Sequence, residues 1–86
     1  MKLIIAIIDD EFGQDVVKAL VDSKIRTTKL SSTGGFLKKG NTTLLIGVEE
    51  VDLVDVVSLI RKKIKSTNSE NGANLFVLDI DSYERI

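Results

Sequence analysis

Residues Leu3 to Ile8 read LIIAII, an uninterrupted apolar and largely β-branched run that ends at Asp9 and Asp10. A short run without polar alternation is typical of a central strand that is covered on both faces. The run is too short for a membrane-spanning helix, which needs about 20 apolar residues. Because no signal-peptide cleavage pattern follows it, the sequence predicts a cytoplasmic protein.

A helix is predicted directly after this strand. Asp9 or Asp10 can cap it, because a carboxylate accepts the free amide protons of a first turn. The pair Ser23 and Lys24 ends it. Its apolar positions recur at helical spacing: Phe12, Val16, Ala19 and Leu20.

The remaining chain predicts three more strands and one more helix. The strands cover 25–32, 42–48 and 74–80, and a polar loop covers 66–72. The second helix begins between Glu49 and Asp52, and its basic last turns suit the negative end of the helix dipole. Its apolar face consists of Leu53, Val56, Val57, Ile60 and Ile64.

The order strand–helix–strand–strand–helix–strand predicts an α+β fold, the ferredoxin-like βαββαβ sandwich. Both crossover connections should be right-handed, which places both helices on one face of the sheet. The 86 residues contain no linker, repeat or low-complexity tract. One domain over residues 1–86 is therefore expected.

Two helices on one face leave the other face bare, although the first strand is apolar on both. Its residues 3, 5 and 7 lie on one side, and residues 4, 6 and 8 on the other. A bare apolar sheet face is an aggregation hazard, and a domain of this size buries only about 60% of its unfolded surface. We therefore expect another copy of the chain to cover it, in a two-fold or three-fold symmetric assembly.

Composition excludes most enzyme classes. The chain has no histidine and no cysteine, so it lacks the commonest general base, the commonest metal ligand and any thiolate. The hydroxyl groups of 31–33 have no histidine to activate them. The net charge of −1 gives no general attraction to nucleic acid or membrane. We expect a protein that is not an enzyme and has no cofactor, no metal, and no nucleic-acid or membrane partner.

The segment SSTGGFLKKGNTTLLIG, residues 31–47, carries the candidate chemistry. The pair Gly34-Gly35 can bring backbone amides close to an anion, with lysines 38 and 39 nearby. Phe36 offers a face for a stacked base, and Asn41 carries the donor and acceptor that read an adenine edge. Gly47 interrupts an apolar strand, which suggests close approach by a ligand or another backbone.

Each of these residues has a simpler interpretation. The glycine pair can be a turn, Phe36 can belong to the core, and the lysines can be a solvated loop tip. Asn41 can cap the turn and Gly47 can mark a bulge. Together they favour a nucleotide site, with Arg26 and Thr28 on the preceding strand near its base. The run Asp9-Asp10-Glu11 is better explained by helix capping than by a metal.

The string RTTKLSSTGGFLKKGNTTLLIGVEE, residues 26–50, resembles the central segment of the PII-like cyclic di-AMP receptors called DarA or PstA. The opening MKLIIAI and the ending NLFVLDIDSYERI are also similar to that family. The resemblance implies a PII-like fold, a homotrimer and a non-catalytic signalling receptor. Cyclic di-AMP would bind between subunits, and the downstream protein is unknown.

Ligand contacts are also carried over from the resemblance. Phe36 would pack against an adenine, and Asn41 with Thr28 would bond base edges. The implied contacts are Arg26, Thr28, Gly35, Phe36, Leu37, Asn41, Gly47 and Arg85. Arg85 stands where the family often has a glutamine, and only STNSENGAN remains of the family's long loop before the last strand.

Three hypotheses follow from the sequence. The first is a receptor for cyclic di-AMP. The second is a PII-like or ACT-like regulator that binds ATP or another small effector. The third is a ligand-free protein-interaction module.

Overall fold

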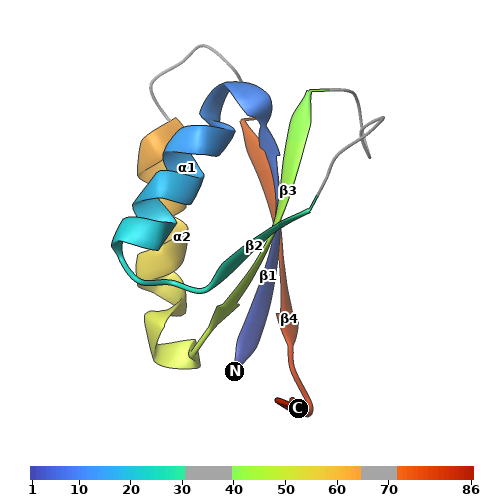
Figure 1. Cartoon of the computed structure of the whole chain (residues 1–86). Helices are drawn as coiled ribbons and strands as arrows, with labels where there is room; N and C mark the ends of the chain where they lie inside the picture. The colour runs from blue at the N-terminus through green and yellow to red at the C-terminus, as the bar shows by residue number, and fades with distance from the viewer. Residues whose placement is uncertain (31–39, 65–71) are drawn as a thin grey trace.

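The computed structural model describes residues 1–30, 40–64 and 72–86. The elements in these residues follow the predicted βαββαβ order, with one short 3-10 helix added (Figure 1). They are β1 (Lys2–Asp9), α1 (Asp10–Asp22), β2 (Thr27–Leu30), β3 (Asn41–Val48), the 3-10 helix η1 (Glu50–Asp52), α2 (Leu53–Ile64) and β4 (Ala73–Asp79).

The strands form one antiparallel sheet in the order β2-β3-β1-β4. The apolar strand β1 is therefore central, as predicted. Figure 1 shows α1 and α2 side by side on the same face of this sheet, and both chain termini at the same end of it. The α+β, ferredoxin-like prediction is confirmed. Neither α-helix of the described residues is long and apolar enough to cross a membrane.

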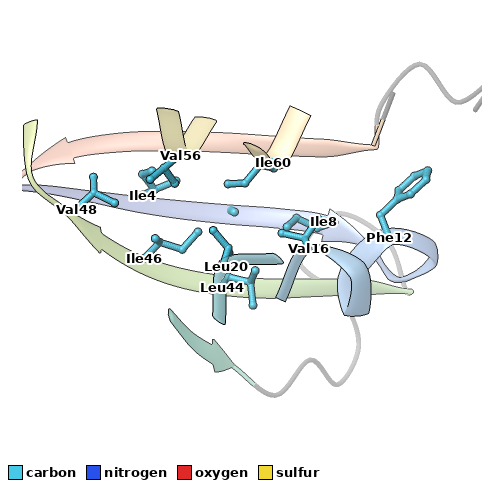
Figure 2. Close-up of a cluster of buried hydrophobic side chains, with 11 residues drawn as sticks. Ile4, Ile8, Phe12, Val16, Leu20, Leu44, Ile46, Val48, Val56 and Ile60 are labelled. Atoms are coloured by element: carbon cyan, nitrogen blue, oxygen red, sulfur yellow. The ribbon is translucent and has the colours of Figure 1, made fainter. Parts of the chain in front are cut away.

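The core lies between the sheet and the two helices. The even-numbered side chains of β1 point into it, and Ile4, Ala6 and Ile8 are completely buried. The even-numbered side chains of β3 meet them, because Ile4 pairs with Ile46 and Ala6 with Leu44. Figure 2 shows the helix contribution to this cluster, which consists of Phe12, Val16, Leu20, Val56 and Ile60.

Helix α1 begins and ends as its sequence predicts. The Asp9 carboxylate accepts a hydrogen bond from the amide of Glu11 at 3.1 Å, which makes Asp9 the N-cap. After the C-cap Ser23, Lys24 adopts a positive φ of 61°, and the amide of Ile25 still bonds back to Leu20 at 2.9 Å.

This helix end explains why β2 is shorter than predicted. The prediction began the strand at 25, but Ile25 is held by the last turn of α1, and the strand begins at Thr27. The predicted residues 31 and 32 lie outside the described residues. The strands β3 and β4 each begin one residue earlier than predicted, and η1 precedes α2 as a separate turn.

The second face of the sheet is apolar and carries no helix (Figure 1). Leu3 and Ile5 are half-buried on it, in register with β4 residues Leu78 and Phe76. Phe76 is 48% exposed and Leu78 is 45% exposed. Ile7, on the same face at the other end of β1, is only 6% exposed. The described residues of a single chain thus leave this face open around Leu3, Ile5, Phe76 and Leu78, and not along the whole of β1.

Candidate functional site

Three predicted ligand contacts share the helix-free face. Gly47 pairs with Leu3, whose side chain lies on that face. Leu45 and Asn41 are two and six residues from Gly47 on β3, so the alternation of a strand puts them on the same face. Thr28 is opposite Leu45, and paired residues project to the same side.

Gly47 sits in a regular part of β3. The pairing with β1 runs without interruption from Ile46 through Gly47 to Val48, so the bulge interpretation is wrong. The backbone φ angle of Gly47 is not positive. A Cβ atom added at Gly47 would meet nothing within 4 Å. The described residues of this chain therefore give no packing reason for a glycine here, and the space in front of its backbone is open.

Asn41 lies at the opposite end of β3 from Gly47. Six residues of strand separate the two by about 20 Å. Thr28, opposite Leu45, is about 13 Å along the sheet from Asn41. One base edge cannot reach both Thr28 and Asn41 of a single chain. Asn41 is 7% exposed and has interactions within the fold.

At the end of β3 that carries Gly47, several of the predicted ligand contacts line a hollow of about 770 Å³. Such a volume is within the range of about 300–1,000 Å³ that small-molecule sites occupy. Arg26, Gly47 and Arg85 all line it. The structure thus brings together three predicted contacts that lie 21 and 38 residues apart in the sequence.

Tyr83 joins this group, and sequence reasoning did not single it out. The guanidinium of Arg26 donates a hydrogen bond from Nη1 to the Tyr83 hydroxyl at 3.3 Å. Tyr83 also lines the hollow and is 56% exposed. Its one signal in the sequence was its place in the family-like ending, because a contact across 57 residues leaves no local pattern.

The hollow carries charges of both signs. Its basic side chains come from the segment after α1 and from the C-terminal residues, and its carboxylates come from the segment before α2 and from the first turn of α2. The basic residues are Lys24, Arg26 and Arg85, and the acidic residues are Glu49, Asp52 and Asp55. An anionic ligand is therefore attracted to the side that holds the two arginines.

Near this end, Lys2 and Asp79 form an ion pair between β1 and β4. The hydrogen bond from the Lys2 ammonium holds the pKa of the Asp79 carboxyl below its usual value, and the carboxylate raises the pKa of Lys2. The Asp79 side chain is largely exposed, whereas that of Lys2 is partly buried. The two residues are directly opposite each other in the pairing of β1 with β4.

The acidic run at the start of α1 has a structural role. Asp9 caps the helix, and Asp10 accepts a hydrogen bond of 2.6 Å from the Thr42 hydroxyl. Among the residues that the structure describes, no group of three or more carboxylates is placed to hold a metal ion. The remaining predicted contacts, Gly35, Phe36 and Leu37, lie outside the described residues.

Comparison with protein families adds the ligand class. The family model of the cyclic-di-AMP receptors matches residues 1–70, which includes the 31–47 segment and both helices. The chain belongs to the cyclic-di-AMP receptor family. The resemblance seen in the sequence is thereby confirmed, and the coarse function of this family member is that of a cyclic-di-AMP receptor.

A solved structure has the same fold. It is the crystal structure of a functionally unknown protein from Pediococcus pentosaceus ATCC 25745, with a TM-score of 0.84 and 37% sequence identity. The match covers 99% of this chain and 96% of that one. The two chains are thus of similar length.

Proposed function

We propose that this family member is a non-catalytic receptor that binds cyclic di-AMP between the subunits of a cytoplasmic homotrimer. The ligand class comes from the family, and the trimer comes from the resemblance to the PII-like receptors. In this proposal a downstream protein recognises either the ligand-bound or the ligand-free form of the receptor.

One observation supports binding between copies. The predicted contacts Thr28 and Gly47 lie on the helix-free face, among the apolar side chains that a neighbouring copy would cover. In the same rows of the sheet, Phe76 and Leu78 are about half exposed. A ligand seated there would touch this chain on one side and the neighbour on the other.

The separation of Asn41 from Gly47 also fits a shared site. The two ends of β3 are about 20 Å apart, so in one chain the arginine pair lies far from Asn41, the residue that the family resemblance assigns to a base edge. In a symmetric assembly, the Asn41 end of one copy can meet the Arg26 end of the next. Each site would then use both ends of β3, from two different subunits.

The chemistry of the described residues supports binding without turnover. The hollow contains arginines, carboxylates and a phenol, but the chain has no histidine or cysteine to serve as base or nucleophile. Its arginines can hold phosphate oxygens through parallel hydrogen bonds. The hollow is suited to holding an anion in place.

Calorimetry tests the ligand, by titration of the protein with cyclic di-AMP, cyclic di-GMP, ATP and AMP. We expect tight binding of cyclic di-AMP alone. Heat with ATP and none with cyclic di-AMP would establish a PII-like or ACT-like regulator instead. If no nucleotide gives heat, the third hypothesis, a ligand-free protein-interaction module, is the one that remains.

Light scattering tests the assembly separately. We expect the mass of three chains at micromolar protein concentration, with or without ligand. A Phe76→Asp variant places a carboxylate on the helix-free face and should lower the mass to that of one chain. Arg61→Ala, an exposed change on α2, is the control and should leave the mass unchanged. A wild-type monomer would refute the trimer.

A further inference from the structure

The C-terminal residues fold back across the end of the sheet. They follow β4, which is one edge strand, whereas Arg26 precedes β2, which is the other edge strand. The hydrogen bond between Arg26 and Tyr83 joins these two edges. The segment after β4 therefore passes the ends of β1 and β3, at the end of the molecule where Figure 1 shows both termini.

The bond to Tyr83 fixes Arg26 without neutralising it. A phenol oxygen is an uncharged acceptor, and a guanidinium has five N–H donors. In residues 1–30, 40–64 and 72–86, the ion pairs are Lys2 with Asp79 and Lys18 with Asp22, and neither involves Arg26. Arg26 thus keeps its charge and most of its donors while its direction is set.

The same segment carries a second guanidinium to the hollow. Arg85 is two residues beyond Tyr83 and lines the hollow with Arg26 and Gly47. Between Ile80 and the end of the chain, the structure gives two hydrogen bonds to the rest of the fold. One is the Tyr83 bond, and the other runs from the Ile80 amide to the Met1 carbonyl at 3.2 Å.

We propose that Tyr83 is a positioning residue for anion binding. Its hydroxyl holds Arg26 at the hollow and ties down the segment that brings Arg85 beside it, so that two guanidiniums are arranged before the ligand arrives. This inference rests on the proposed function for the identity of the anion, the phosphates of cyclic di-AMP. Pre-arrangement raises affinity because less side-chain freedom is lost on binding.

One test needs no ligand. Tyr83 is the only tyrosine and the chain has no tryptophan, so tyrosine fluorescence reports on this residue alone. Arg26→Ala should lower the fluorescence anisotropy of Tyr83 and make its emission easier to quench with acrylamide. Arg61→Ala removes an exposed arginine of α2 that does not line the hollow, and it should change neither value. Equal values for all three proteins would overturn the proposal.

The second test is a double-mutant cycle read by titration with cyclic di-AMP. Tyr83→Phe removes the hydroxyl and keeps the ring, and it should weaken binding roughly threefold to tenfold, the effect of one hydrogen bond. In the Arg26→Ala background the same change should have no further effect, because Tyr83 acts through Arg26.

The outcomes separate this inference from the proposed function. Tyr83→Phe binding as tightly as the wild type, or losing equal affinity in both backgrounds, would overturn the positioning role. Wild-type protein that binds no cyclic di-AMP would overturn the proposed function, while the fluorescence comparison would still decide whether Arg26 holds Tyr83.

Discussion

Replacement of Gly47 by alanine should affect stability and ligand binding in opposite directions. An added Cβ atom meets nothing within 4 Å in the chain, and Gly47 lies in an unbroken strand without a positive φ. Alanine removes the extra backbone freedom of glycine from the unfolded state, which is worth about 0.5–1 kcal/mol. We expect the free energy of unfolding of the isolated chain to rise by up to that amount, or the melting temperature to rise by roughly 2–8 °C.

Ligand binding should weaken in the same variant. If cyclic di-AMP or the neighbouring subunit approaches the open backbone of Gly47, a methyl group overfills that contact at a cost of about 1–3 kcal/mol. This cost corresponds to an affinity roughly 5-fold to 150-fold lower. Calorimetry measures the affinity, and light scattering shows whether the assembly is intact. Thermal unfolding without ligand measures the stability of the isolated chain when Gly47→Ala is made in the Phe76→Asp background, which should be monomeric.

Gly13→Ala is the matched control, since it makes the same chemical change where the chain itself leaves no room. Its added Cβ would lie 2.9 Å from the Thr42 hydroxyl oxygen, so this variant should lose stability. A Gly47→Ala change that also lowers stability in the monomeric Phe76→Asp background would refute the open-backbone geometry. A stable Gly47→Ala trimer with unchanged affinity would show that nothing approaches this backbone closely in the complex.

Three further changes test other parts of the molecule. Phe36→Ala should weaken cyclic di-AMP binding by about 1–3 kcal/mol in calorimetry while the trimer stays intact, whereas unfolding of the variant would make Phe36 a core residue. Gly72→Ala should lower the free energy of unfolding by about 1–3 kcal/mol in denaturant titrations, because its methyl group would overlap Ile64; an unchanged midpoint would contradict this packing. The Asp79 carboxyl has its pKa lowered by Lys2, so its contribution is present above about pH 4 and is lost as the pH falls through the lowered pKa. Asp79→Asn should therefore flatten the loss of stability below about pH 4, and an identical pH profile would exclude a role for the pair.

Much of the fold could be predicted because local signals and topology agree. The run from Leu3 to Ile8 has no polar interruption, so its central place in the sheet follows from burial alone. The cap at Asp9 follows from a carboxylate just before a helical pattern. Right-handed crossovers then leave one sheet face bare, and the exposed Phe76 and Leu78 are its consequence.

The structural details that the sequence predicted wrongly or did not reveal depend on contacts between residues far apart in the chain. The β-branched side chain of Ile25 predicts a strand, but its amide completes the last turn of α1. The bulge interpretation of Gly47 could be rejected only from the strand register. The contact between Arg26 and Tyr83 depends on how the chain end crosses the sheet, which neither residue encodes in its neighbourhood.

If cyclic di-AMP binds on the helix-free face between copies of the chain, as proposed above, ligand binding and assembly form one linked equilibrium. In the pairing of the sheet, Gly47 lies beside Leu3, and Leu3 beside Leu78, so a predicted contact and an exposed apolar side chain belong to one row. In the proposed assembly, a ligand in that row would contact the copy that covers it, so it would bind the assembled state more tightly than the free chain. By linkage it would stabilise the assembly by the same free energy. The bound state can then differ from the empty one in how firmly the copies are held, without any rearrangement of the strands.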